Sequence, residues 1–358
     1  MSEIRVLVVD DSAFLQRNIP LILESDSDIK VIGTAGNGVE ALEMAKRLKP
    51  DVITLDIIMP VMDGLTALKR IMKENPIPVV MLSSLTYEGA RQTMEALSLG
   101  AVDFITKPSG TVSFDIAKIR GEIVEKVKMA AMARTDIARR MPEKLVPELS
   151  GALKNAGQLT LPTSGGTAKV RKELIAIATS TGGPAALPVV LGNLPRDMSA
   201  GLIIVQHIAE GFTEALAERL DSLSPLRIKV CKDFDELVPG TGLLAPAGMH
   251  VTVKRVAGKL YAALSKEPSA SLHRPSADVL FTSVAKVCGA SACAVIMTGM
   301  GDDGSRGILA IREQGGVTIA QDEDTSVIFG MPKAAIKSGG IDVIVPLNHI
   351  AGEIIRAL

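Results

Sequence analysis

Short apolar runs alternate with amphipathic segments along most of this 358-residue chain. In the first third the alternation repeats five times, with helical periodicity between the apolar runs, for example at residues 41–48 and 65–73. Five such repeats predict an α/β domain with a doubly wound, five-stranded parallel sheet of the flavodoxin-like kind. Nearly all strand residues are apolar, as expected where helices cover both faces. The expected strands are residues 4–9, 29–34, 52–55, 79–82 and 102–105.

The alternation fades between residues 129 and 170, where arginines, prolines and Ser-Gly pairs give a linker composition. We therefore expect one domain over residues 1–128, a linker over 129–170 and a second α/β domain over 171–358. The second domain is expected to have a Rossmann-like, mostly parallel sheet. Glycine turns between residues 243 and 264 predict a β-hairpin excursion from it. Its other expected strands are residues 174–178, 202–206, 228–231, 292–297, 317–320 and 341–345.

Composition excludes several classes of function. The formal net charge of −1 argues against nucleic acid as the main partner. No apolar run approaches the length of a transmembrane helix, so no membrane insertion is expected. The three cysteines have no metal-type spacing, which favours reduced thiols and a cytoplasmic location.

Five polar residues stand at the ends of expected strands in the first domain. Asp10 and Asp11 follow the first strand, and Asp56 follows the third. The carboxyl ends of parallel strands lie at one edge of the sheet, so these carboxylates should converge, and their oxygens suit a divalent cation such as Mg²⁺. Ser83 ends the fourth strand and Lys107 follows the fifth. Carboxylates, a metal, a hydroxyl and an ammonium group together predict a phosphoryl-acceptor site.

Residues 4–128 resemble a two-component receiver domain through the segments 56–64 and 106–108. This resemblance implies that Asp56 is the phosphoacceptor and that Asp10 and Asp11 hold the metal together with it. It also implies that Ser83 is the switch hydroxyl and that Lys107 is the partner of the phosphate. Phe104 occupies the position of the switch aromatic residue.

The second domain offers a serine, a histidine and an acid at three strand ends. Ser180 lies in a Thr-Ser-Thr-Gly-Gly turn, which taken alone could equally cradle a phosphate. His207 follows the next strand, and Asp302 and Asp303 follow another. A serine nucleophile needs a base and the base needs an orienting carboxylate. The pattern therefore predicts a Ser-His-Asp set, and geometry leaves open which aspartate completes it.

Further motifs lie in the segments 178–184, 205–208, 244–250, 273–281, 297–304 and 331–335. Through these segments and its receiver-like first domain, the whole chain resembles the chemotaxis response regulator protein-glutamate methylesterases, the CheB family. The motif register in this resemblance implies that Ser180 is the nucleophile, His207 the general base and Asp303 the orienting carboxylate. It places Thr181 and Met300 near the oxyanion hole.

The resemblance implies demethylation of glutamate methyl esters on methyl-accepting chemoreceptors, with release of methanol, and deamidation of receptor glutamines. It implies a chemotaxis histidine kinase as phosphodonor, Mg²⁺ at the receiver and no cofactor for the esterase. His250 and His273 are expected to shape the cleft or to form buried hydrogen bonds. Two alternatives are the same enzyme in a non-motility chemosensory pathway and a receiver-linked module that binds receptors without hydrolysis.

Overall fold

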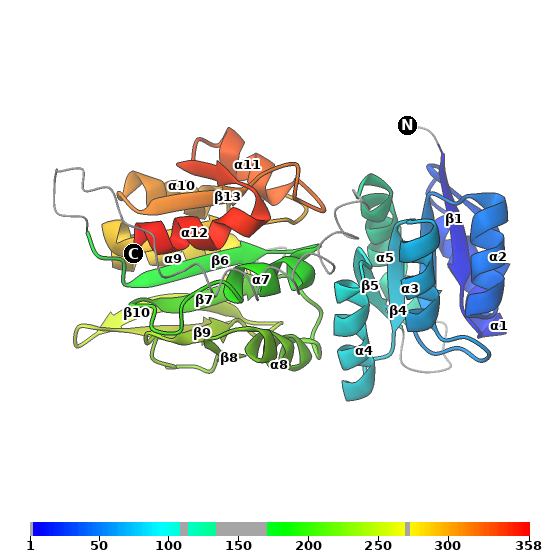
Figure 1. Ribbon diagram of the computed structural model, residues 1–358, viewed down its shortest axis with the longest axis horizontal. Coiled ribbons are helices and arrows are strands. Elements are labelled where there is room, and N and C mark those ends of the chain that lie inside the picture. Colours follow the sequence, from blue (N-terminus) through cyan, green and yellow to red (C-terminus); the bar gives the residue numbers. More distant parts are fainter. Residues whose placement is uncertain (1–2, 108–113, 134–169, 269–272) are drawn as a thin grey trace.

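The computed structural model describes residues 3–107, 114–133, 170–268 and 273–358. They form two α/β units that lie side by side, each built on a parallel sheet (Figure 1). The last helix of the first unit ends at Met132, so the first residues of the expected linker are helical, and residues 134–169 lie outside the described part. Within the described residues, no helix has both the length and the apolar character needed to cross a bilayer.

The first unit has five parallel strands in the order β2-β1-β3-β4-β5, as its sequence pattern predicts. Alternate residues of β1 serve two cores. Val6 and Val8 pack with α1 and α5, whereas Leu7 and Val9 face α2, α3 and α4. The elements are β1 (Ile4–Val9), α1 (Ala13–Leu23), β2 (Ile29–Ala35), α2 (Gly38–Leu48), β3 (Val52–Asp56), α3 (Gly64–Glu74), β4 (Val79–Ser83), α4 (Tyr87–Ser98), β5 (Asp103–Thr106) and α5 (Phe114–Met132).

The second unit has seven parallel strands in the order β14-β13-β12-β6-β7-β9-β8, with a separate antiparallel hairpin. The elements up to the hairpin are β6 (Leu174–Thr179), α7 (Gly183–Leu191), β7 (Gly201–Gln206), α8 (Thr213–Leu223), β8 (Arg227–Val230), β9 (Thr241–Leu244), β10 (His250–Val256) and β11 (Lys259–Ser265). They are followed by α9 (Ala277–Cys288), the short 3₁₀ helix η1 (Gly289–Ser291), β12 (Ala292–Ile296), α10 (Ser305–Glu313), β13 (Val317–Gln321), α11 (Met331–Lys337), β14 (Val343–Val345) and α12 (Leu347–Ala357).

The expected hairpin lies at β10 and β11, but it begins later in the chain than the glycine turns predict. Residues 243 and 244 belong to β9, which pairs with β7 and β8 in the main sheet. The end of β9 is fully buried, as in the central strands, whereas β10 ends in exposed residues. Burial therefore separates two β segments that look alike in the sequence.

β6 lies at the centre of the second sheet, between β7 and β12. Ile175 and Ile177 face the core under α7, α8 and α12, whereas Ala176 and Ala178 face α9, α10 and α11. The chain winds outward from β6 in both directions, so the crevice beyond the carboxyl ends of β6, β7 and β12 is the topological switch point where ligands bind in such sheets.

Candidate active site

Ser180 lies in the tight turn between β6 and α7. Its N–H donates to the carbonyl of Thr298 at 3.0 Å, and its own carbonyl accepts from the N–H of Gly183 at 2.8 Å. Gly182 adopts the left-handed region at φ +82°, and a Cβ there would lie 2.8 Å from Cβ of Val327. Only glycine meets both conditions. The turn therefore holds Ser180 in one place at the end of β6.

Gln206, the last residue of β7, joins the serine turn to the histidine turn. Its side-chain amide donates to the carbonyl oxygens of Ser180 and His207, both at 2.8 Å. Gly183 lies so close that a Cβ there would be 2.0 Å from Oε1 of Gln206. The two turns are thus fixed relative to each other by one buried side chain.

His207 and Asp303 meet across this crevice. Nε2 of His207 lies 2.8 Å from Oδ2 of Asp303. An ionised carboxylate only accepts hydrogen bonds, so Nε2 carries a proton, and in the neutral ring the lone pair is on Nδ1. Nδ1 is buried and has no hydrogen-bond partner among the described residues. The histidine therefore offers a free basic nitrogen.

Further hydrogen bonds from the start of α9 hold the Asp303 carboxylate. It accepts from the hydroxyl of Ser276 at 2.8 Å and from the N–H groups of Ala277 at 2.7 Å and Asp278 at 3.0 Å. Burial alone would raise the pKa of Asp303, but the hydrogen bonds from His207 and the α9 backbone outweigh it and hold that pKa well below its usual range. Asp303 is therefore ionised at neutral pH.

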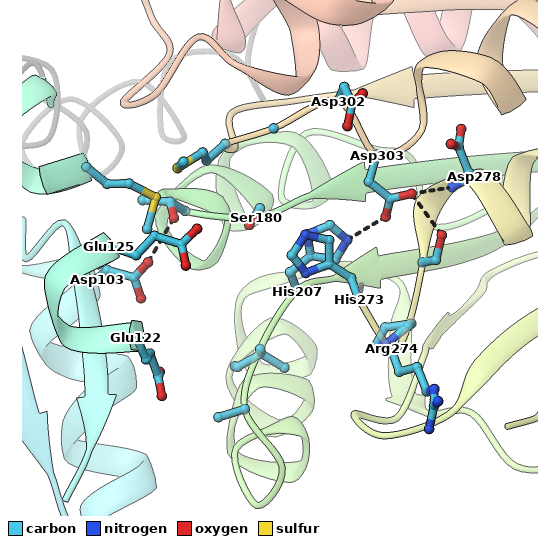
Figure 2. Close-up of a pocket in the computed structure, with 18 of the residues that line it drawn as sticks. Asp103, Glu122, Glu125, Ser180, His207, His273, Arg274, Asp278, Asp302 and Asp303 are labelled. Atoms are coloured by element: carbon cyan, nitrogen blue, oxygen red, sulfur yellow. Dashed lines mark hydrogen bonds and ion pairs between the residues drawn. The ribbon is translucent and has the colours of Figure 1, made fainter. Parts of the chain in front are cut away.

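The neighbouring residues Asp302 and Asp303 differ in their surroundings. Asp303 contacts His207, whereas Asp302 is exposed at the edge of the same cleft. Ser180 also lines this cleft (Figure 2). The contacts among the described residues include no hydrogen bond from the Ser180 hydroxyl to His207. Such contacts are often open in enzymes without substrate and close when substrate binds.

The cleft has a volume of about 920 Å³, and both units form its walls. Thr181 is buried and Met300 is 37% exposed, and both line it on the second unit. His273 and Arg274 line it as well. The opposite wall belongs to β5 and α5 of the first unit (Figure 2). That wall consists of Asp103, Phe104, Glu122, Glu125, Lys126 and Met129.

Asp103 of the first unit binds the residue that follows Ser180. The hydroxyl of Thr181 donates to Oδ2 of Asp103 at 2.8 Å. Nζ of Lys126 lies 3.3 Å from the other Asp103 oxygen and 3.0 Å from Oε1 of Glu122. Burial opposes the charge of Lys126, but these two carboxylates raise its pKa overall. A charged cluster on the first unit thus holds the turn that carries Ser180.

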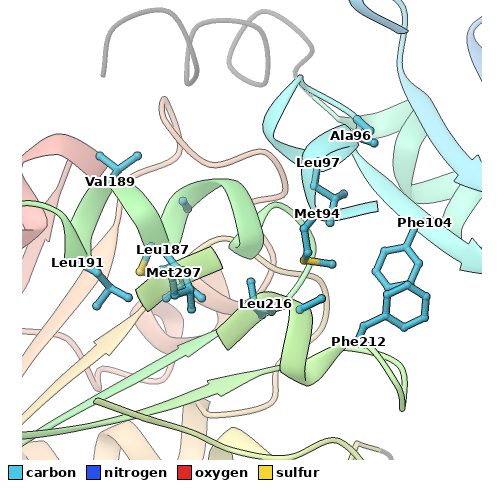
Figure 3. Packing of buried hydrophobic residues seen from close by; sticks show 14 of the residues in the cluster. Met94, Ala96, Leu97, Phe104, Leu187, Val189, Leu191, Phe212, Leu216 and Met297 are labelled. Carbon is cyan, nitrogen blue, oxygen red and sulfur yellow. The ribbon is translucent and has the colours of Figure 1, made fainter. Parts of the chain in front are cut away.

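Next to this cluster, aromatic rings close the interface between the units. The rings of Phe104 and Phe212 have centroids 4.3 Å apart at an angle of 41°, and both side chains are buried (Figure 3). Further out, the hydroxyl of Tyr87 on α4 donates to Glu218 on α8 at 2.8 Å. The residue expected to be the switch aromatic of the first unit is therefore an interface residue.

The polar strand ends of the first unit also come together. Nζ of Lys107 lies 2.8 Å from Oδ2 of Asp10 and 2.7 Å from Oδ2 of Asp56. Burial raises the pKa of Asp56 to about 6, although Lys107 acts to lower it. Ser83 lines the same small cavity as Asp56, while its hydroxyl accepts from Thr93 at 2.7 Å.

The acidic residues of this cavity fit a divalent cation. Ligand oxygens of Asp10, Asp11 and Asp56 all lie within 4.8 Å of one another. Asp11 is exposed and the other two are buried, so a bound cation would keep an open side. Oxygen ligands of this kind are those that Mg²⁺ prefers.

Three residues of the site were not predicted from the sequence. Gln206 and Ser276 lie within the segments 205–208 and 273–281, but the presence of a single amide or hydroxyl does not show which distant group it binds. Asp103 has no signal at all, because its contact crosses from one unit to the other. His250, by contrast, is buried beside the carbonyl of Pro268, 3.2 Å away, as expected of a structural histidine.

Comparison with known proteins agrees with this architecture. The CheB methylesterase family model matches residues 175–354, and the response regulator receiver domain model matches residues 6–115. The chain is 45% identical to a protein-glutamate methylesterase/protein-glutamine glutaminase of Geobacillus kaustophilus, over 100% of this chain and 99% of the relative. It is also 45% identical to the Archaeoglobus fulgidus protein of the same name, over 99% of this chain and 98% of the relative.

A solved structure resembles the second unit. The CheB methylesterase catalytic domain of Thermotoga maritima superposes with a TM-score of 0.51 at 38% identity, covering 53% of this chain and 100% of that domain. The receiver and catalytic matches lie in the first and second units respectively. The chain therefore belongs to the CheB methylesterase family, with an N-terminal response regulator receiver domain.

Proposed function

We propose that this chain is a receiver-regulated serine esterase in which Ser180 is the nucleophile, His207 the general base and Asp303 the carboxylate that orients His207. One observation carries the proposal. The bond between Nε2 and Asp303 makes Nδ1 the nitrogen that holds the lone pair of the neutral His207 ring. Nδ1 is buried and has no partner among the described residues, in the cleft that Ser180 lines. A base for serine needs this fixed tautomer.

The proposed reaction begins when Oγ of Ser180 attacks an ester carbonyl and its proton passes to Nδ1 of His207. Backbone N–H groups near Thr181 and Met300 would stabilise the oxyanion of the tetrahedral intermediate. The carbon–oxygen bond to the leaving alcohol then breaks, and His207 returns the proton to the alcohol. A water molecule, deprotonated by His207, releases the acyl group as a carboxylate and restores Ser180. This route uses no metal or organic cofactor.

The relatives' names give the substrate class that we propose for this chain. A protein glutamyl methyl ester would yield glutamate and methanol, and a protein glutamine would yield glutamate and ammonia. The same acyl-enzyme serves both reactions, because only the leaving group differs. By family membership, the proposed substrates are the cytoplasmic helices of methyl-accepting chemoreceptors, and a chemotaxis histidine kinase is the proposed phosphodonor.

The receiver site is proposed to control the esterase through phosphorylation of Asp56. Asp10, Asp11 and Asp56 would hold Mg²⁺, which neutralises phosphoryl oxygens when bound. A phosphoryl group adds roughly −1.5 to −2 charges at pH 7, and we expect Lys107 and Ser83 to bind it. Lys107 directly follows β5, the strand that carries Asp103 and Phe104 to the cleft. Movement of this strand would weaken the contact between the receiver domain and the cleft that Ser180 lines.

Replacement of Asp56→Asn tests this control. Methanol release from methylated receptor membranes should rise when a small-molecule phosphodonor and Mg²⁺ are added to the wild-type chain. The variant should keep the basal rate and lose the stimulation, because it lacks the acceptor carboxylate. Chelation of Mg²⁺ should remove the stimulation from the wild type in the same assay. Stimulation of the variant to the wild-type level would rule out Asp56 as the acceptor.

Replacement of Asp103→Ala should raise the basal rate without any phosphodonor. The change removes the acceptor for Thr181 and one of the two carboxylates that pair with Lys126. Loss of one charge-assisted hydrogen bond between the domains corresponds to an increase of about tenfold or more in the open population, and hence in methanol release. Glu125→Gln is the matched control, because it removes a charge from the same wall. Equal rates for the two variants would contradict the prediction.

A further inference from the structure

His273 is the histidine of the cleft that the proposed triad does not use. Its ring stacks on the ring of His207, with centroids 4.3 Å apart and an angle of 18° between the ring planes. Figure 2 shows the two rings face to face beside Asp303. Near-parallel rings at this separation make a face contact rather than an edge contact.

The hydrogen bond to Asp303 alone does not fix the plane of the His207 ring. It holds Nε2 at 2.8 Å, but the ring can still tilt about that contact and move Nδ1 away from Ser180. A second ring against its face blocks the tilt. Together, Asp303 in the plane and His273 on the face define the orientation of the base.

The charge state of His273 suits this arrangement. Burial lowers the pKa of His273, and the neighbouring His207 lowers it further, while Asp303 and Asp302 act weakly in the opposite direction. His273 is therefore neutral at neutral pH and presents a π face to His207, which becomes positively charged when it takes the serine proton. The charged groups that line the cleft, besides the two histidines, are Asp103, Glu122, Glu125, Lys126, Arg274, Asp278, Asp302, Asp303 and Arg306.

We infer that His273 is a positioning residue for the esterase reaction, which holds the His207 ring in the plane of Asp303 and stabilises its imidazolium through the stacked face. The inference rests on the proposed roles of Ser180 and His207. It assigns His273 an action through His207 rather than on the substrate. Loss of the aromatic ring of His273 that stacks on His207 should therefore lower kcat and leave KM nearly unchanged.

The test uses the full chain and methanol release from methylated receptor membranes as a function of pH. His273→Ala should lower kcat on the order of tenfold, as expected for loss of one contact to a charged ring. The acidic limb of the kcat/KM profile is where a histidine base loses activity by protonation, and its midpoint should move to lower pH because the imidazolium loses stabilisation. His273→Phe keeps an aromatic face, so it should retain most of kcat and the wild-type midpoint.

His273→Leu fills the space without an aromatic face and should behave like the alanine variant, so the comparison with phenylalanine stands even if alanine prevents folding. The inference is overturned if leucine and phenylalanine give the same kcat and midpoint, or if KM rises while kcat is unchanged. Failure of the proposed function is distinguishable, because it would appear as methanol release that survives in Ser180→Ala.

Discussion

Replacement of Ser180→Ala is expected to abolish methanol release from methylated receptors while the fold is retained. The turn around Ser180 is held by its backbone groups, which bond to Thr298 and Gly183, and by Gln206, so loss of the hydroxyl breaks none of these contacts. Loss of a serine nucleophile that acts with a histidine base costs about 10⁵- to 10⁶-fold in kcat. Methanol release and the melting temperature of the full chain are the two measurements.

Ser222→Ala is the matched control for this variant. Ser222 is exposed on α8, and its hydroxyl bonds only within its own helix, to the carbonyl of Arg219. It should keep the wild-type rate. Ser180→Ala should also keep its binding to receptor membranes in co-sedimentation, which separates an enzyme from a module that only binds. Turnover by Ser180→Ala at a rate near that of the wild type would exclude the nucleophile assignment.

Replacement of Asp303→Asn is expected to lower kcat by about 10⁴-fold, because the base adopts the wrong tautomer. The Oδ2 position accepts from both Nε2 of His207 and the N–H of Ala277. The Oδ1 position accepts from Ser276 and Asp278. An amide has one oxygen, so its NH₂ group must face donors at one of these positions. If the NH₂ group faces Nε2, the ring proton moves to Nδ1 and His207 ceases to be a base toward Ser180.

Asp302→Asn provides the matched control, with the same chemical change one residue earlier in the chain. Asp302 is exposed, so this variant should keep nearly the wild-type kcat. Asp303→Asn should also lower the melting temperature, because it disturbs hydrogen bonds at the start of α9. The kinetic comparison should therefore be made well below that temperature. Similar losses in both variants would show that Asp303 has no special role.

Much of the fold follows from the sequence because the strands are short, apolar and separated by helical periodicity. In the receiver domain, each predicted strand lies within one residue of the observed one at either end. The strand ends also predict that Asp10 and Asp56 meet, since parallel topology leaves them no other edge of the sheet. In the same way, Ser180 and His207 come to one crevice because β6 and β7 are neighbours.

Contacts that depend on which elements pack against each other, rather than on the order of parallel strands, were beyond prediction from the sequence. The sequence did not distinguish β9 from the hairpin strands. The place of β9 between β7 and β8 depends on which elements cover it, and its own residues do not show this. The choice of Asp303 over Asp302 needed either a family motif or the position of the α9 backbone. The bond between Thr181 and Asp103 depends on how two domains pack, and neither residue type indicates it.

β5 of the receiver domain carries side chains that contact the esterase domain directly. Asp103 contacts Thr181 and Phe104 contacts Phe212. The strand that carries both residues ends next to Lys107 at the proposed phosphorylation site. A receiver grafted from another response regulator would bring the same phosphoryl chemistry. We expect such a receiver to accept a phosphoryl group without controlling the esterase, unless it also carries these two side chains at the start of its fifth strand. We therefore expect that the receiver domain of this protein cannot be exchanged for another without loss of control over the esterase.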